Sequence, residues 1–412
     1  MLVIGAGISG LSAAAWLTRK GYRVLVLEGR RRLGGRVWSD RSLGFPVDLG
    51  GSWIHEATGN PITALCQRAG IETRIDQDHW QFRNPDGKPL PDAAEDELDS
   101  LNAWLLKRFA ENAGDSQKQV AEQALAGRNL TAEQKLLTRE FYHGCATEFG
   151  ALPEDVSVAA YRDGGYRGRD RIFPGGYAQV ADYLARGLSV KLDQVVKQVD
   201  WGPGGVRVTT QTQVWRARCS VVTLPLGVLQ SGSVRFTPAL PAAQQSALGG
   251  LKMGLLNKLV FTFPKAFWPG SYQHFANLSE ETGVLGEIAN LQNLYGRNGL
   301  LLFLAGRPAW QRESWNDGQL RQEAWQVLQR LFAGAISPTA FRVTRWGADP
   351  FARGSYSYLP PGVSPRLRSA LAEPQPPLFF AGEATHEEMS ATVHGAHLSG
   401  QRAAAEVDEA WT

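Results

Sequence analysis

The stretch "LVIGAGISGLSAAAWLTRKGYRVLVLE", residues 2–28, decides the fold. An apolar run leads into a glycine-rich turn and a helical segment, and a second apolar run ends at Glu28. Gly5, Gly7 and Gly10 have the G-x-G-x-x-G spacing, which permits a tight turn, close approach of a pyrophosphate, and close packing of helix on strand. A carboxylate about 20 residues further on suits ribose hydroxyls, and Glu28 has that place. Unless the glycines form a chance turn, this is a strand–turn–helix–strand unit that binds a dinucleotide.

The composition is that of an ordinary globular protein, with 412 residues, 43% of them hydrophobic and 20% charged, which is enough for two domains. A net charge of +3 predicts neither a nucleic acid nor an anionic membrane surface as a partner. No apolar run reaches the roughly 18 residues of a membrane span. Cys66, Cys145 and Cys219 lie far apart without a C-x-x-C spacing. We therefore expect no metal site and a reducing, cytoplasmic location.

The pattern along the chain predicts a discontinuous α/β protein. Residues 90–160 carry apolar side chains at helical spacing, as in a helical insertion, and residues 188–225 read as strands. Further elements are expected as strands at 255–263, 284–290, 299–305 and 341–346 and a helix near 317–334. The last segment, from "PLFFAG" onward, repeats the strand–loop–helix order of the first. We therefore predict a Rossmann-like nucleotide-binding domain formed by residues 1–57, 172–232 and 372–412. The second, α+β domain, with a mixed sheet and the helical insertion, would comprise residues 58–171 and 233–371 and bind the substrate.

A family resemblance rests on the residues that follow Glu28. "EGRRRLGGRVW", residues 28–38, has the pattern E-x-R-x-R-x-G-G-R. Directly after a dinucleotide fold, this pattern resembles the FAD-dependent amine oxidase superfamily, which includes polyamine oxidases, monoamine oxidases and lysine-specific histone demethylases. The likeness extends over nearly the whole chain, through "VDLGGSWIHE" (47–56), "IFPGGYAQVADYLA" (172–185), "VKLDQVVKQVDW" (190–201), "VVTLPLGVL" (221–229) and "FFAGEATHEEMSATVHGAHLSG" (379–400). The motifs are closest to those of polyamine and spermine oxidases.

The resemblance implies FAD as the cofactor and gives roles to several residues. Arg36 would contact the pyrophosphate, the backbone at Val196 would pair with adenine, and Glu383 would lie near the ribityl and phosphate groups. A helix that starts near Val393 would point its N-terminus at the pyrimidine ring. The remaining cofactor-binding candidates are Arg30, Gly50, Gly51, Ser52, Trp53 and Thr392. Where monoamine oxidases attach FAD through a cysteine, this chain has Ser355, so FAD should be non-covalent.

Lys258 is the first catalytic candidate. The stretch "GLLNKLVFTF", residues 254–263, reads as a buried strand, and burying an unpaired ammonium group is costly. Strand alternation places Leu256, Lys258 and Val260 on one face. The resemblance implies that this face looks into the active cavity and that Lys258 holds a water molecule beside flavin N5. The alternative is an edge strand whose lysine reaches solvent.

His55 is the second catalytic candidate and also a substrate-binding one. Polyamine oxidases often carry a histidine or a carboxylate at this position, where its protonation near neutral pH would affect the bound amine; the alternative is a structural histidine. Trp346 and Tyr356 are candidate walls of the substrate site, unless they are ordinary packing. Met389 stands where many amine oxidases have an aromatic residue of the amine-binding sandwich, which leaves the substrate class open. Glu148 is a candidate acid of a polycation channel, and for His394 and His397 we expect packing roles.

The function implied is the oxidation of an amine, with spermine or spermidine as first choice. Hydride transfer to FAD would give an imine that water hydrolyses to an aldehyde, and dioxygen would take the electrons as hydrogen peroxide. Alternatives are a monoamine or L-amino-acid oxidase, for which the arginines of residues 161–171 could bind a carboxylate, a carotenoid- or porphyrinogen-type FAD enzyme, and a non-enzymatic flavoprotein. The sequence does not give the oligomeric state or the true electron acceptor.

Overall fold

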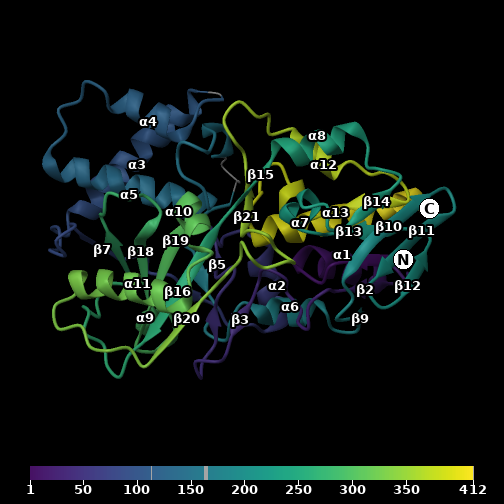
Figure 1. Ribbon diagram of the computed structural model, residues 1–412, viewed down its shortest axis with the longest axis horizontal. Helices are drawn as coiled ribbons and strands as arrows, with labels where there is room; N and C mark the ends of the chain where they lie inside the picture. Colours follow the sequence, from purple (N-terminus) through teal and green to yellow (C-terminus); the bar gives the residue numbers. More distant parts are fainter. Residues whose placement is uncertain (113, 162–165, 412) are drawn as a thin grey trace.

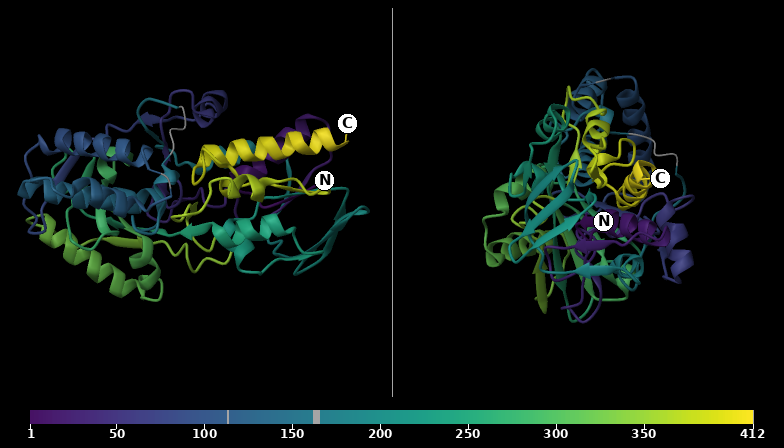
Figure 2. Two further views of the ribbon diagram at one scale, coloured as in Figure 1. Left: turned by 90° about the horizontal axis from the view of Figure 1, so that it is seen from above. Right: turned by 90° about the vertical axis from the view of Figure 1, so that its right-hand side faces the viewer.

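The structure is a computed structural model that describes residues 1–112, 114–161 and 166–411 (Figure 1). Two assemblies of strands and helices lie along its longest axis. Both termini lie at one end of the molecule, with the C-terminal helix α13 (Val393–Trp411) running towards that end (Figure 2). The predicted α/β class with a Rossmann-like unit is confirmed.

A five-stranded parallel sheet forms the centre of the half that carries the termini. Its strands come from the beginning, the middle and the end of the chain, in the order β22 (Leu378–Phe380), β13 (Ser220–Val222), β1 (Leu2–Ile4), β2 (Leu25–Leu27) and β9 (Ser189–Lys191). Every neighbouring pair is parallel. The nucleotide-binding unit is therefore discontinuous, as expected, although the domain boundaries themselves stay a prediction.

This sheet is the middle of three layers. One face packs on helices, because Val3, Val26 and Val221 share a core with apolar residues of α1 (Ile8–Arg19), α2 (Pro61–Ala69), α6 (Ala178–Leu184) and α13. On the other face, Ile4 and Phe380 pack on a second sheet. That sheet has the order β12 (Val214–Ala217), β11 (Gly205–Thr210), β10 (Val196–Gly202) and β14 (Arg235–Thr237). Both faces of the parallel sheet are thus covered, which explains its continuous apolar strands.

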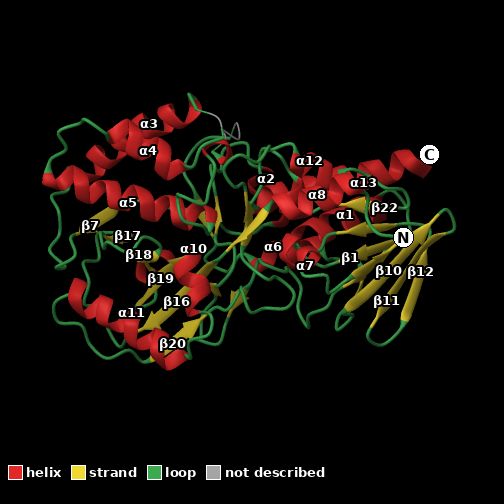
Figure 3. Ribbon diagram, turned by 45° about the horizontal axis from the view of Figure 1, so that its top comes forward, coloured by secondary structure: helices red, strands yellow, loops and turns green. Residues whose placement is uncertain are grey.

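A six-stranded mixed sheet forms the other half. Its order is β20 (Ala340–Val343), β16 (Leu256–Thr262), β19 (Gly299–Ala305), β18 (Val284–Asn290), β17 (His274–Asn277) and β7 (Trp80–Arg83). Helix α11 (Asp317–Leu331) packs on one face, where Leu259 and Phe261 join its apolar residues. The predicted helical insertion, formed by α3 (Ala94–Ala110), α4 (Gln117–Leu125) and α5 (Ala132–Phe149), lies on the other side (Figure 3).

Short elements connect these layers. They are β3 (Ser39–Asp40), β4 (Val47–Asp48), β5 (Trp53–Ile54), β6 (Arg74–Ile75), β8 (Arg171–Ile172), α7 (Leu226–Gln230), α8 (Ala242–Gly250), β15 (Lys252–Gly254), α9 (Leu291–Tyr295), α10 (Gly306–Arg312), β21 (Tyr356–Tyr358) and α12 (Leu367–Ala372). In the described ranges, no helix is both long and apolar enough to cross a membrane.

Candidate functional site

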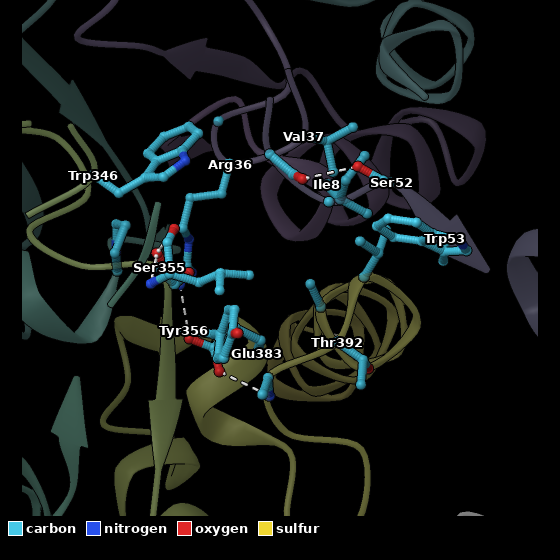
Figure 4. A pocket seen from close by; sticks show the side chains of 18 of the residues that line it. Ile8, Arg36, Val37, Ser52, Trp53, Trp346, Ser355, Tyr356, Glu383 and Thr392 are labelled. Atoms are coloured by element: carbon cyan, nitrogen blue, oxygen red, sulfur yellow. Dashed lines mark hydrogen bonds and ion pairs between the residues drawn. The ribbon is translucent and has the colours of Figure 1, made fainter. Parts of the chain in front are cut away.

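One large cavity, of about 1330 Å³, connects the two halves of the molecule. Its first part opens at the carboxyl ends of the parallel strands, where β1 lies between β2 and β13. Ligands of doubly wound sheets bind at such ends. Its second part lies between the six-stranded sheet and the helical insertion, and Figure 4 shows Arg36, Trp346 and Tyr356 on one side of the pocket and Trp53 and Thr392 on the other.

The three glycines of the first turn have different structural roles. Gly5 has φ of +108°, a conformation that L side chains rarely adopt. A Cβ built on Gly10 would lie 2.0 Å from the Gly5 carbonyl oxygen, so Gly10 lets the helix pack on the strand, and it does not itself line the cavity. Gly7 precedes α1, and no side chain caps the first N–H groups of this helix. Because Gly7, Ile8 and Ser9 line the cavity, these N–H groups are available to a phosphate there.

Glu28 is positioned to bind hydroxyl groups. Its carboxylate is 6% exposed and accepts hydrogen bonds from the backbone N–H of Ala6 (2.7 Å) and of Arg30 (2.8 Å). Burial raises the pKa of Glu28, while these two bonds oppose the rise. Two carboxylate oxygens accept about four hydrogen bonds, so capacity remains for a ribose. The Arg30 side chain is itself held by two bonds, of 2.6 and 2.9 Å, to Asp349.

Arg36 and Glu383 form an ion pair at the centre of the cavity. The Arg36 guanidinium donates to Glu383 Oε1 and to the Ser355 carbonyl, both at 2.9 Å. Burial acts to raise the pKa of Glu383, but Arg36 and Arg368 outweigh it and hold that pKa below its usual range. Glu383 therefore stays ionised and fixes a guanidinium that can still bind a phosphate.

The glycines after β4 allow a close approach of several backbones. A Cβ on Gly50 would lie 1.8 Å from the Arg36 carbonyl oxygen, and one on Gly51 would lie 3.1 Å from Val393 Cγ2. Val393 begins α13, and the preceding Thr392 hydroxyl accepts a hydrogen bond from the Gly395 N–H at 2.9 Å. The start of α13 thus faces the cavity close to the glycine segment, as the sequence predicts.

Val196 also lines the cavity, beside a register shift between β10 and β11. With a bare helix N-terminus, a ribose-facing carboxylate and a fixed guanidinium in one elongated cavity, the residues present fit FAD.

Ser355 does not offer an attachment point, because its hydroxyl bonds to both the N–H and the carbonyl of Leu256 at 2.9 Å. Cys145 is the one cysteine that lines the cavity, and it belongs to α5. Non-covalent attachment stays a prediction.

Lys258 is 3% exposed and faces the cavity from β16. Its Nζ donates to the carbonyl oxygens of Asp48 (3.0 Å) and Gly50 (2.7 Å) and to the Ser52 hydroxyl, and it lies 5.3 Å from the centre of the Trp53 ring. Burial lowers the pKa of Lys258 to about 7, although the Asp48 carboxylate opposes this. The lysine is on a central strand, so the edge-strand alternative is wrong. Its contacts with the glycine segment place it beside the expected flavin ring.

Asp48 lies next to Lys258, and sequence reasoning missed it although it stands two residues before Gly50, in the same quoted stretch. The carboxyl group is fully buried and accepts hydrogen bonds from Ser39, from the Tyr177 N–H (2.9 Å) and from the Tyr295 hydroxyl (3.3 Å). Burial raises the pKa of Asp48, while these bonds and the Lys258 ammonium oppose the rise. Asp48 and Lys258 therefore stabilise each other's charged form against the effect of burial.

His55 lies in the cavity wall and pairs with a carboxylate. Its Nδ1 is 2.5 Å from Asp170 Oδ2, and its side chain is 55% exposed. Desolvation lowers the pKa of His55, but Asp170, with Glu148 and Glu56, outweighs it and raises that pKa to about 9. The imidazole is therefore cationic at neutral pH, not poised there as we expected, because the sequence did not show Asp170 as its partner.

Of the expected substrate walls, the structure places two in the cavity. Trp346 lines it and donates from Nε1 to the Leu49 carbonyl at 3.1 Å, and Tyr356 lines it with its hydroxyl bonded to the Thr147 carbonyl. Met389 does not line the cavity. Its backbone carbonyl instead packs on Gly395, where a Cβ would lie 1.8 Å away, so the expected substrate contact of Met389 is not supported.

The remaining candidates are two histidines of α13 and the arginines of residues 161–171. His397 is buried outside the cavity and bonded to the Ser12 hydroxyl at 2.7 Å, while His394 lines the cavity edge and contacts Asn60 at 3.2 Å. Of the arginines in residues 161–171, Arg169 lines the cavity but bonds Gln77, and the one at position 162 lies outside the described residues. Over the described part of the chain, no group of three or more histidine, cysteine, aspartate or glutamate side chains could hold a metal ion.

Carboxylates line the second part of the cavity. Glu148 is one of them, as the sequence suggested, and the others were missed because they come from distant elements. They are Asp76, Asp78, Glu95, Asp99, Glu140, Asp170 and Glu287. Two of them already have partners, since Asp170 pairs with His55 and the oxygens of Asp76 lie 3.2 and 3.3 Å from Nε2 of buried His274. An array of acids beside a buried lysine favours ligands that carry several positive charges.

Comparison with known proteins agrees with this geometry. A model of the family "Flavin containing amine oxidoreductase" matches residues 8–408. "Polyamine oxidase 2" of Arabidopsis thaliana is 31% identical over 98% of this chain and 87% of its own length. "Lysine-specific histone demethylase 1 homolog 1" of Oryza sativa subsp. japonica is 33% identical over 99% of this chain and 52% of its own length. "Polyamine oxidase 4" of rice is 30% identical over 98% and 88%. The chain thus spans about half the length of the demethylase homologue and nearly nine tenths of the polyamine oxidases.

Proposed function

Because the chain belongs to the family of flavin-containing amine oxidoreductases, with FAD as cofactor, we propose that its substrate is a polyamine such as spermine or spermidine. The observation that supports this choice is the set of carboxylates that lines the second part of the cavity. A singly charged amine can pair with only one or two of these carboxylates, whereas a polycation is attracted and oriented by the whole set.

FAD supplies the two-electron oxidation of the carbon next to nitrogen, water then hydrolyses the resulting iminium to an aldehyde, and dioxygen takes the electrons as hydrogen peroxide. The chain's own residues bind and orient. Trp346 and Tyr356 wall the site, and Lys258 binds the carbonyls of Asp48 and Gly50 and the Ser52 hydroxyl. A water molecule beside the flavin would have to take the place of one of these three acceptors, because an ammonium group has three N–H donors. The His55–Asp170 pair presents a positive imidazolium that disfavours a protonated reacting amine, so the amine reacts in its neutral form.

A second candidate is the oxidation of a lysine side chain in a peptide. It is favoured by the histone demethylase homologues, two of which are 33 and 34% identical to this chain.

A peroxide assay tests the proposal. Purified holoenzyme is given spermine, spermidine, putrescine, tyramine, common amino acids or a methylated-lysine peptide in air, and peroxide and aldehyde are quantified. We expect spermine or spermidine to give the highest kcat/KM. Turnover of the peptide with none of the polyamines would overturn the polyamine proposal in favour of the second candidate. Bleaching of the flavin by an amine without peroxide would show that dioxygen is not the electron acceptor.

A further inference from the structure

Two carboxylates of the second part of the cavity, Glu140 and Glu287, lie close to each other. Glu140, on α5, is 5% exposed, and Glu287 comes from β18. A Cβ built on Gly144 would lie 3.9 Å from Glu287 Oε1, and the Thr147 side chain hydrogen-bonds to Glu287. Positions 140, 144 and 147 share one face of a helix. The carboxylate of Glu287 therefore lies along the face of α5 that carries Glu140.

Neither carboxylate forms an ion pair with a cationic side chain of the described residues, although His274, itself paired with Asp76, is near enough to act on Glu287. Within the described residues, Glu140 Oε2 and Asn102 Oδ1 are buried acceptors without a hydrogen-bond partner, and both side chains line the cavity. Burial raises the pKa of Glu140, and the negative charge of Glu287 raises it further. Burial also raises the pKa of Glu287; Thr147 and His274 oppose this rise, and Glu148 and Asp78 add to it. Two buried carboxylates side by side are unfavourable when both are ionised, so the ligand-free pair tends to hold a proton that a bound cation can replace.

The sheet register places this pair relative to Lys258. On the cavity face, Lys258 of β16 lies opposite Phe303 of β19. The pairing of β19 with β18 shifts between Val284 and Ile288, so residues 285–287 form a bulge opposite Phe303. A bulge of this kind re-aims a side chain, and Phe303 and Glu287 both line the cavity. Lys258 and Glu287 are therefore two strand spacings apart, or about 10 Å along the sheet.

We propose that Glu140, Glu287 and Asn102 form a second cation subsite, which binds the distal ammonium group of a di- or polyamine while the reacting amine lies near Lys258. This rests on the proposed amine oxidation and adds the substrate's second charge and its distance. An ammonium group has three N–H donors and no acceptor, which suits two carboxylates and the unpartnered Oδ1 of Asn102, a residue of α3, the helix that packs on α5. Hydrogen bonds between charged groups are about twice as strong as neutral ones.

The side chain between the two charged positions supports a chain-like substrate. Phe303 lies between Lys258 and the bulge and is 6% exposed, and Phe82 and Trp80 continue the same cavity face beyond Glu287. Methylene groups pack on aromatic surface, so the segment between two nitrogens is accommodated there. The exposed carboxylates Asp78 and Asp99 also line the cavity and attract cations towards it.

The experiment compares diamines with monoamines of equal length. Holoenzyme is titrated anaerobically with α,ω-diaminoalkanes, from diaminopropane to diaminododecane, and with the matching alkylamines, and the flavin absorbance gives each Kd. We expect the diamine to bind about tenfold to hundredfold more tightly at the length that spans the two sites, and not at the shortest length. Glu140→Gln and Glu287→Gln should each remove this advantage and leave the Kd of the alkylamine unchanged. Glu133→Gln, at the start of the same helix and outside the cavity, should retain it.

Thermal stability gives a readout that does not depend on turnover. Since each substitution removes a repelled charge, Glu140→Gln and Glu287→Gln should raise the Tm of ligand-free holoenzyme, whereas a purely structural carboxylate would lower it when replaced. A long diamine should raise the Tm of the wild type more than that of either variant. Equal binding of diamines and alkylamines by the wild type, or an advantage that survives in both variants, would overturn the subsite. Neither result decides the proposed function, which fails if the peroxide assay shows no turnover of any polyamine.

Discussion

A buried ammonium group is stable only when hydrogen-bond acceptors surround it. For Lys258 these acceptors are backbone carbonyls of the segment that we expect to contact the flavin. The carbonyls of Asp48 and Gly50 accept hydrogen bonds from its Nζ, and the Asp48 carboxylate supplies the nearby negative charge. The same contacts tie β16 to the glycine segment across the cavity. A single residue thus links the two halves of the molecule at the place where we expect the reaction centre.

Lys258→Met tests the catalytic part of this role. The thioether is close in length and removes the N–H donors, so we expect flavin reduction or reoxidation to slow by about a hundredfold, at the low end for a positioned proton-transfer group. Stopped-flow absorbance separates the two half-reactions. Leu256→Met, on the same strand face, is the matched control and should keep both rates. Unchanged rates in Lys258→Met would refute a catalytic role for the lysine.

Asp170→Asn tests the charge of His55. The carboxylate raises the pKa of His55 above its usual 6.5 to about 9, so the substitution should bring that pKa down by one unit or more. A histidine with a raised pKa stabilises the fold below pH 6.5 and loses this contribution as the pH rises through 9. The pKa is measured by NMR of labelled histidine, with His55→Ala to assign the signal. A wild-type signal that titrates near pH 6.5 would contradict the ion pair.

At the scale of elements, the sequence predicted most of what local pattern can encode. The glycine spacing identified α1, and apolar runs identified β16, β18 and β19, because a central strand is apolar on both faces. The carboxylate subsite could not be predicted in this way. Glu140 sits in α5 among other polar residues, and only the packing of α5 on the bulge of β18 brings it to Glu287. The substrate contact expected of Met389 stays a prediction, since Met389 is not among the residues that line the cavity.

The turn between β1 and α1 gives a prediction that separates folding from cofactor binding. A Cβ on Gly7 meets nothing within 4 Å, whereas one on Gly10 collides with the Gly5 carbonyl. Gly10→Ala should therefore destabilise the apoprotein, by about 1–3 kcal/mol as in overpacked cores. Gly7→Ala should leave apoprotein stability unchanged and weaken FAD binding, because its methyl group faces the pyrophosphate. Denaturant unfolding of the apoprotein and FAD titration measure the two effects, and equal destabilisation by both substitutions would contradict this division of roles.

For the molecule as a whole, FAD should act as a removable link between segments far apart in the chain. The cavity is lined by Gly7, Glu28, Val196, Lys258 and Glu383. These residues belong to, or closely follow, strands of all three large sheets, and they range from the beginning to the end of the sequence. Position 355 is a serine, so it offers no cysteine for covalent attachment of FAD. Acid precipitation should therefore leave all FAD in the supernatant. The apoprotein should melt at a lower Tm than the holoenzyme, and added FAD should restore the Tm in proportion to the logarithm of its concentration, as mass action requires. Flavin that stays with the precipitate, or a Tm that ignores FAD, would show that the cofactor is attached covalently or does not hold these segments together.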